Sequence, residues 1–551
     1  MPKIGAFTFV LHSHLPYCRM AGLWPHGEEW IHEAAAESYI PLLNALYDLR
    51  ERGISAPLTI SLTPVLAEQL ADADIQVHFE QYLNDKIESA RRDLPRFEMA
   101  GEASRRSLAN FYLDWYSRVL TSFADRFHRD LVGAFRTLQE EGRIEVVTSA
   151  ATHGYLPLLS RDESISLQLK TAVSSYRRQM GRNPRAVWLP ECAYRPASRT
   201  ASGVLRPGLE EFLQRNGLSL FFSDTQAVEG GELSGVAAGH AIGPYGQVVQ
   251  RYGFPLQVSG PKQPGSSYQP YYVGQSQVAV LARNRATGLQ VWSADWGYPG
   301  EAAYREFHKK DGISGMQYWR VSGARVDLGQ KEVYEPEKAQ QRVQEHADHF
   351  AHLVENLLAD FHRESGRVGI LAANYDTELF GHWWFEGMDW VREVLQRLAN
   401  SSQVELTTSS EFLTRHPPQE RVNLPETSWG AGGGHFTWDN ADTHWMWEPI
   451  HQAEEQMARL VARYRSPAAD SRAALNQTAR ELLLLQSSDW PFLVSTGQAK
   501  EYSIQRFRSH LDRFGQLAHA LEIGQTPTLL AHEFWQLDRL FEDIDYTWFE
   551  A

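Results

Sequence analysis

The chain has 551 residues, a formal net charge of −15 and only two cysteines, Cys18 and Cys192. The negative charge argues against general attraction to nucleic acid or anionic membranes, and two cysteines in unlike surroundings exclude a disulfide scaffold. The apolar N-terminal run ends at His12, so it is too short for a signal peptide, and no later stretch has the about 20 apolar residues of a membrane span. We therefore expect a cytoplasmic protein that does not contact membranes.

Short apolar runs alternate with helical patterns over about the first 400 residues. Seven runs have the composition of strands, at residues 4–11, 58–62, 144–148, 186–189, 218–223, 278–282 and 368–372. Strands of this length that alternate with helices are typical of a parallel α/β architecture, and seven units favour a barrel over an open sheet.

Three regions depart from this alternation. Apolar residues at helical spacing predict a helical insertion at about residues 74–140. Residues 225–276 are rich in Gly, Pro and Gln, and they predict long loops of the kind that cover a site. The pattern becomes helical toward the C-terminus, so we expect a catalytic domain over residues 1–415 and a helical domain over residues 416–551.

Aromatic residues make up 12% of the chain and include 17 tryptophans, many beside Gly, His, Asp or Glu. Such surroundings suit sugars, because their C–H faces stack on rings while their hydroxyls hydrogen-bond to polar neighbours. The composition favours a carbohydrate ligand, although a tryptophan-rich core gives the same count.

The first of four polar clusters, residues 11–17, reads LHSHLPY and ends the first predicted strand. His12 and His14 are two positions apart, so their side chains can point the same way. Such a pair can bind a metal ion, hydrogen-bond a ligand or satisfy itself in a turn. The spacing alone leaves all three possibilities open.

Two further clusters place a carboxylate directly after a predicted strand. Glu191 lies in residues 187–196, VWLPECAYRP, and Asp376 lies in residues 373–384, ANYDTELFGHWW. Catalytic groups of barrels are found at this end of the strands. Glycosidic cleavage needs two carboxylates, one to attack the anomeric carbon and one to protonate the leaving oxygen. The structural alternative for Glu191 is an ion pair with Arg195.

The fourth cluster, residues 427–439, reads TSWGAGGGHFTWD. It lacks the lysine and the strand–helix context of a phosphate-binding loop. A tightly turned loop that displays Trp429 and Trp438 suits sugar stacking, and a clasp between domains is the structural alternative.

Together these clusters closely resemble the sequence regions of glycoside hydrolase family 57, and within it those of the α-1,4-glucan branching enzymes. The resemblance extends to residues 24–30, WPHGEEW, and to residues 152–157, THGYLP. The ordered combination spans most of the chain, so it is far more specific than any single motif. It implies a distorted (β/α)7 barrel with a helical insertion and an all-helical C-terminal domain.

The resemblance also implies roles for the matching residues. Glu191 would be the nucleophile that forms a covalent glycosyl-enzyme, giving retention, and Asp376 would be the general acid/base. The implied substrate is an α-1,4-glucan such as amylose, glycogen or starch, with no metal or other cofactor. The implied substrate-binding residues are His12, His14, Trp30, His153, Arg283, Trp292, Trp429, Trp438 and Asp489. Among these, Arg283 is expected to orient a carboxylate.

One stretch departs from the family pattern. The branching enzymes that this sequence resembles carry a tyrosine at the tip of a mobile loop after the nucleophile, but residues 225–244 contain no Tyr, Phe or Trp. His240 and Tyr245 are the candidates to replace it.

Three alternatives to a branching enzyme therefore stay open. A loop that excludes water poorly would make the chain an α-amylase-type hydrolase. A metal-dependent enzyme resembling polysaccharide deacetylases would use the His-x-His pair as ligands. A noncatalytic glucan-binding module is the third, and the presence of both carboxylates argues against it.

Overall fold

The computed structural model describes residues 3–199, 203, 205–230, 242–243, 246–247, 263–292, 297–323 and 326–550. Its centre is a sheet of ten strands, in which seven parallel strands follow the order β12-β1-β2-β3-β4-β7-β11. These are β1 (Gly5–Ser13), β2 (Leu58–Leu62), β3 (Ile144–Ser149), β4 (Ala186–Trp188), β7 (Leu220–Ser223), β11 (Ala279–Ala282) and β12 (Gly369–Asp376). Each lies where the sequence predicts a strand.

The barrel is distorted where its two ends meet. In the described chain, β11 and β12 share no strand ladder. The N–H of Asn284 instead donates to the carbonyl of Ala372 (3.2 Å), and that of Ile370 donates to Tyr268 (2.9 Å). Three further strands extend the sheet, namely β10 (Tyr271–Val273), β13 (Val404–Leu406) and β14 (Arg421–Val422).

The barrel interior is filled with apolar side chains at alternate strand positions, as expected for one face of a strand. All are exposed by 2% or less, and they are Ala6, Val10, Val147, Ala186, Trp188, Leu220, Phe222, Ala279, Leu281, Ile370 and Ala372. The interior is therefore a packed core, and a ligand can enter only at the ends of the strands.

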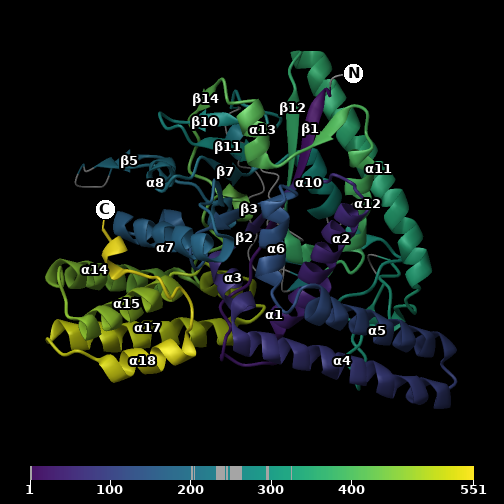
Figure 1. Ribbon diagram of the computed structural model, residues 1–551, viewed down its shortest axis with the longest axis horizontal. Helices are drawn as coiled ribbons and strands as arrows, with labels where there is room; N and C mark the ends of the chain where they lie inside the picture. Colours follow the sequence, from purple (N-terminus) through teal and green to yellow (C-terminus); the bar gives the residue numbers. More distant parts are fainter. Residues whose placement is uncertain are drawn as a thin grey trace.

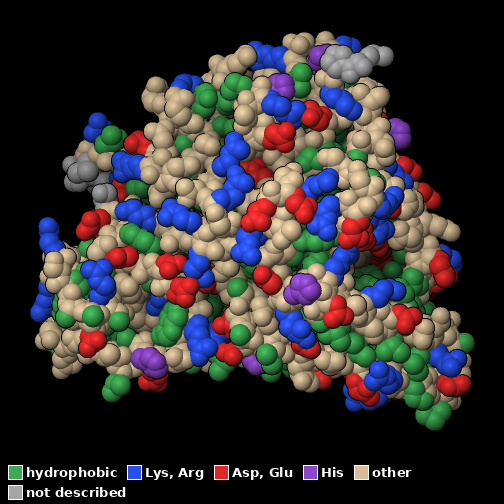
Figure 2. All heavy atoms as spheres, in the orientation of Figure 1, with side chains coloured by type: hydrophobic (Ala, Val, Ile, Leu, Met, Phe, Trp, Pro, Cys, Tyr) green, Lys and Arg blue, Asp and Glu red, His purple; other side chains and the backbone are tan. Residues whose placement is uncertain are grey.

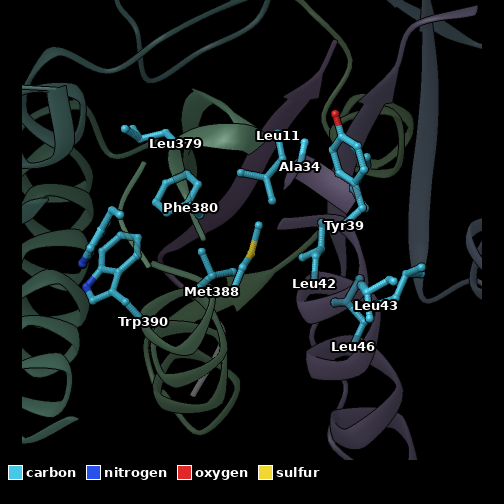
Figure 3. Packing of buried hydrophobic residues seen from close by; sticks show 14 of the residues in the cluster. Leu11, Ala34, Tyr39, Leu42, Leu43, Leu46, Leu379, Phe380, Met388 and Trp390 are labelled. Carbon is cyan, nitrogen blue, oxygen red and sulfur yellow. The ribbon is translucent and has the colours of Figure 1, made fainter. Parts of the chain in front are cut away.

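Helices surround this sheet. They are α1 (Glu29–Ala34), α2 (Ile40–Glu51), α3 (Pro64–Ala71), α6 (Leu131–Glu140), α7 (Asp162–Met180), α8 (Leu209–Arg215), α9 (Thr225–Glu229), α10 (Arg285–Trp292), α11 (Pro336–Ser365), α12 (Gly387–Ala399) and α13 (Ser409–Arg415). A π-helical turn, Ala35–Tyr39, joins α1 to α2. In Figure 3, Leu42 on α2 and Met388 on α12 lie on facing helices below Leu11 of β1, so the two helices share one core.

Two helical bodies lie beside the barrel (Figure 1). The first is a hairpin of α4 (Ala73–Met99) and α5 (Ala103–Thr121), in the region where the sequence indicates a helical insertion. The second contains α14 (Trp447–Arg463), α15 (Ala469–Leu485), α16 (Asp489–Thr496), α17 (Lys500–Glu522) and α18 (Thr528–Leu537). None of the helices in the described ranges combines the length and apolarity needed to cross a bilayer.

The sequence did not predict the structure of the segment between α10 and α11. It contains little regular secondary structure in its described residues, yet it buries Tyr304 and Tyr318 in the main core. The hydroxyl of Tyr318 donates to Asp93 of α4 (2.7 Å). This segment therefore ties the helical insertion to the barrel.

Candidate active site

Glu191 lies in a turn just after β4 and has a left-handed backbone, with φ +60°. Such a conformation costs on the order of 1–3 kcal/mol for a residue with a side chain, so it persists only where neighbours hold it. Here the N–H of Trp429 donates to the carbonyl of Glu191 (3.0 Å), while Tyr194 and Thr427 exchange two backbone hydrogen bonds. Backbone hydrogen bonds from the loop that follows Thr427 thus hold the turn that carries Glu191 in place.

The side chain of Glu191 also meets this loop. The indole Nε1 of Trp429 donates to Oε2 (2.7 Å), and Nδ1 of His153 lies 3.8 Å from Oε1. Burial raises the pKa of Glu191 to about 7, although the hydrogen bond from Trp429 lowers it. The alternative partner, Arg195, instead lies near Asp162, with Nη2 and Oδ1 3.7 Å apart.

Asp376 ends β12 and pairs in register with His12 of β1. Its enclosed position raises the pKa of Asp376 well above its usual value, and the carboxylates of Glu378 and Glu191 raise it further. The structure thus brings Asp376 under the electrostatic influence of Glu191, and Asp376 holds its proton more firmly than an ordinary aspartate. Such a pair can divide the roles of acid and nucleophile.

Three histidines pack together at the ends of β1 and β3. The His14 and His153 rings stack with centroids 3.8 Å apart, and the Nε2 atoms of His12 and His153 are 3.1 Å apart. Burial, and then the neighbouring His14, lower the pKa of both His12 and His153 well below the usual value. Both rings are therefore neutral near pH 7, and one Nε2 donates its proton to the other.

The C-terminal helices complete this group. Asp489, at the start of α16, accepts a hydrogen bond from Nε2 of His14 (3.0 Å), and Oγ of Ser488 lies 2.8 Å from Nδ1 of His153. Although burial lowers the pKa of His14, the carboxylates of Asp489, Glu191 and Glu378 together raise it above its usual value. The site thus lies where the barrel meets the C-terminal helices.

The group formed by His14, His153 and Asp489 also has the composition of a metal site, because one ligand atom from each lies within 4.8 Å of the others. However, every ring nitrogen of the two histidines already has a protein hydrogen-bond partner. These nitrogens are therefore arranged to form a hydrogen-bonded group that can contact a polar substrate. They are less well arranged to coordinate a metal ion, as a deacetylase-like centre would require.

Aromatic rings line the same region. The Trp292 ring lies 6.4 Å from the rings of both Trp429 and Tyr375, and its indole N–H is buried without a hydrogen-bond partner in the described chain. Nε and Nη2 of Arg283 donate to the carboxylate of Asp224 at 3.1 and 2.9 Å. Trp292 thus lies near both Trp429, which contacts Glu191, and Tyr375, which precedes Asp376.

The prediction for Trp438 is wrong. The side chain of Trp438 is only 1% exposed and stacks on Tyr155, with centroids 4.5 Å apart. A Cβ added at Gly430 would come within 2.4 Å of the indole, so the loop can pass over Trp438 only with glycine at this position. Trp438 supports the loop from below and offers no face to a sugar.

The remaining predicted residues lie elsewhere. Trp30 of α1 lies edge-on to Tyr502 of α17, with centroids 5.3 Å apart, at the seam between the barrel helices and the C-terminal helices. The loop candidates His240 and Tyr245 lie outside the described residues.

Sequence reasoning missed several supporting groups. Oε1 of Glu378 accepts hydrogen bonds from the N–H of His14 (3.1 Å) and from the hydroxyl of Tyr39, and burial raises the pKa of Glu378 to about 7. Ser61 and Thr63 hold Nδ1 of His12 and of His14. Both follow the pattern of polar residues at strand ends that identified the two histidines, so this signal could have found them.

Comparison with known proteins identifies this arrangement. Residues 8–425 match the family profile described as Glycosyl hydrolase family 57. The chain belongs to this family. Residues 449–549 match a second profile, described as the C-terminal domain of 1,4-alpha-glucan branching enzyme. The predicted family, a distorted (β/α)7 barrel with a helical insertion, and an all-helical C-terminal region are therefore confirmed.

Three relatives show how close the family resemblance is. A 1,4-alpha-glucan branching enzyme of Thermococcus kodakarensis is 43% identical, over 98% of this chain and 78% of that protein. The crystal structure of a GH57-type branching enzyme from Pyrococcus horikoshii has a TM-score of 0.87 at 43% identity and covers 100% of this chain and 97% of its own. The α-amylase AmyC from Thermotoga maritima has a TM-score of 0.82 at 29% identity and covers 99% of each chain.

Proposed function

We propose that this chain is an α-1,4-glucan branching enzyme that transfers a cleaved glucan to a 6-hydroxyl with retention. The observation that carries the proposal is the pair of enclosed carboxyl groups at the ends of β4 and β12, each with a raised pKa. The two relatives at 43% identity and the match to a branching-enzyme C-terminal domain support the branching reaction over simple hydrolysis.

Cleavage divides the work between the two carboxyl groups. The ionised carboxylate of Glu191 attacks the anomeric carbon and forms a covalent ester, while the bond to the glycosidic oxygen breaks. Asp376 donates its proton to that oxygen as the shortened glucan leaves. The raised pKa of Asp376 supports this order, because an acid must still hold its proton when the nucleophile has lost its own.

Transfer reverses these roles. The carboxylate of Asp376 removes the proton from the 6-hydroxyl of an acceptor chain, and the resulting oxygen displaces Glu191 from the anomeric carbon. Two inversions at one carbon give net retention. Asp376 then holds a proton and Glu191 is again ionised, so the site returns to its starting state.

The other groups bind and orient the sugar. Neutral His12 and His153 are suited to meet sugar hydroxyls, and Trp429 fixes the carboxylate of Glu191. Trp292 supplies a ring near Trp429, and its indole N–H has no partner among the residues that the structure describes. The catalytic domain of residues 1–415 and the C-terminal domain of residues 416–551 would each supply one side of the glucan groove, the latter through Asp489.

Hydrolysis is the second candidate, because it needs only water in place of the acceptor. Residues 225–244 have no aromatic side chain to shield the intermediate, and the chain also resembles an α-amylase at 29% identity. Both reactions share the covalent intermediate and the same two carboxyl groups. They differ only in whether water or the 6-hydroxyl of an acceptor chain attacks the intermediate.

Trapping the intermediate tests the shared mechanism. Asp376→Asn should still react with α-maltosyl fluoride, because fluoride leaves without a proton, and should then accumulate the glycosyl-enzyme. Peptide mass spectrometry should place the added maltosyl mass on Glu191. A label on another residue, or inversion at the anomeric carbon in the wild-type product, would reject the proposed roles.

A further inference from the structure

A hollow of about 810 Å³ lies between α2, α5 and α12, and none of its lining residues belongs to the site of Glu191 and Asp376. Figure 2 shows the surface hollowed beside these helices, with hydrophobic side chains inside and charged ones at the edge. The volume is within the range of about 300–1,000 Å³ that is typical of ligand sites. The proposed reaction gives this hollow no role.

Aromatic rings form one wall of the hollow. Phe111 and Trp115 project from α5, and Phe385 precedes α12. The Phe385 ring centroid lies 5.3 Å from that of Trp115 and 6.3 Å from that of Phe111. All three side chains are only partly buried. The Arg305 guanidinium covers one face of Phe385 at 3.9 Å, so Phe111 and Trp115 are the rings that are open to a ligand.

A buried carboxyl group in the same lining has an unused oxygen. Glu386 is 4% exposed, and its Oε1 accepts hydrogen bonds from the hydroxyl of Tyr334 (2.6 Å) and the N–H of Arg305 (3.1 Å). Its Oε2 is buried and has no hydrogen-bond partner among the described residues. A buried polar atom without a partner is costly, so such an atom beside a hollow indicates a missing ligand group.

The rim carries charges of both signs together with neutral amides. Its polar side chains include those of Asn44, Asp48, Asp114, Gln340, Asp389 and Arg392. A mixed rim of this kind favours neither a phosphate nor a cation. It suits a neutral ligand with many hydroxyls, which can donate to carboxylates and accept from amides and guanidinium groups.

We propose that this hollow is a second α-glucan-binding site, in which a glucose ring stacks on Trp115 and a sugar hydroxyl meets Oε2 of Glu386. The inference takes its ligand class from the proposed function. A branched polymer held here and in the catalytic groove at once gains affinity through effective concentration. A short oligosaccharide can occupy only one of the two sites at a time.

Binding to glycogen tests the proposal. Affinity electrophoresis through glycogen-containing gels should show that Trp115→Ala weakens retention about three- to tenfold, the value of one stacked ring. Trp115→Phe keeps a ring and should restore most of the affinity. Trp535→Ala is the matched control, because Trp535 is a partly exposed tryptophan on α18 that is covered by Arg480 at 4.5 Å. All three variants should cleave short maltooligosaccharides as the wild type does.

Two results would contradict the proposal of a second glucan-binding site. Wild-type affinity for glycogen in Trp115→Ala would overturn the proposal, and so would an equal loss in Trp535→Ala. If Trp115→Ala does not fold, a wild-type crystal soaked with maltoheptaose decides, since density on Trp115 supports the site and an empty hollow beside an occupied catalytic groove rejects it. Failure of the proposed function is distinct, because wild-type protein would then form no α-1,6 linkages on amylose, whatever its affinity for glycogen.

Discussion

The indole Nε1 of Trp429 donates a 2.7 Å hydrogen bond to Oε2 of Glu191, although the two residues are 238 positions apart in the chain. The backbone N–H of Trp429 also donates to the carbonyl of Glu191. One residue of a loop outside the barrel strands thus fixes both the main chain and the side chain of the proposed nucleophile.

Replacing Trp429 with phenylalanine should therefore shift the pH dependence of the reaction. The hydrogen bond lowers the pKa of Glu191, so its loss raises that pKa, and the nucleophile becomes ionised only at higher pH. The acid limb of kcat/KM should move up by about one pH unit, with activity at pH 6 falling about tenfold. Trp292→Phe is the control, because the indole N–H of Trp292 has no hydrogen-bond partner among the described residues. An unmoved acid limb in Trp429→Phe would contradict the account.

Substitution of each of the two carboxyl groups should impair a different step of the reaction. Asp376→Asn removes the proton donor, so turnover of amylose should fall by about 10²- to 10⁴-fold, while the first step on α-maltosyl fluoride survives. Glu191→Gln removes the nucleophile and should lose both activities while glucan binding persists. Rates on both donors, with binding measured by calorimetry, check the contrast. Substantial turnover of the fluoride by Glu191→Gln would assign the attack to another group.

Much of this fold could be predicted, because its strands are short apolar runs that end in polar motifs. All seven predicted strands are present, and both carboxylates stand at strand ends. The packing of side chains over long sequence distances could not be predicted. Trp429 and Trp438 look alike in sequence, yet one contacts Glu191 and the other is buried under Gly430.

Contacts that depend on tertiary structure could also not be predicted from the sequence. Ser488 and Asp489 reach the histidines only because the C-terminal helices pack on the end of the barrel. The burial that raises the pKa of Glu378 to about 7 likewise depends on neighbours far away in sequence. Local periodicity carries no information about such contacts.

Glu386 should make stability depend on pH. Burial raises the pKa of Glu386 to about 7, so the folded protein binds this proton more tightly than the unfolded chain. Its contribution to the free energy of unfolding is full below the unfolded pKa of about 4 and is lost as pH rises through about 7. Glu386→Gln mimics the protonated form, so it should be more stable than wild type at pH 8, by about 1–3 kcal/mol, and similar at pH 4.5.

Thermal unfolding of both proteins between pH 4.5 and pH 8 measures this difference. The gap in Tm between Glu386→Gln and wild type should widen as pH rises. A gap that stays constant, or that widens toward low pH, would show that Glu386 does not bind its proton more tightly in the folded state.

Gly381, in the loop after Asp376, should not tolerate alanine. Its φ is +101°, and an added Cβ would lie 1.7 Å from the carbonyl oxygen of Glu37. Gly381→Ala should therefore lower the free energy of unfolding by about 3 kcal/mol or more. Two causes contribute to this loss, namely backbone strain at a positive φ and the clash of the added Cβ. Gly101→Ala separates them, because Gly101 also has a positive φ, +69°, but an added Cβ there has no atom within 4 Å. In Gly101→Ala the free energy of unfolding should fall by only about 1 kcal/mol. If urea unfolding gave the same loss for both variants, the clash at Gly381 would be excluded as a cause.

The central claim is that a glucan held on Glu191 passes to another glucan and not to water. The most direct measurement incubates purified protein with amylose and follows new α-1,6 linkages and new reducing ends in the same samples, with Glu191→Gln as the inactive control. The account predicts that branches form well ahead of reducing ends. Reducing ends that accumulate without branches would contradict it and make the chain a hydrolase.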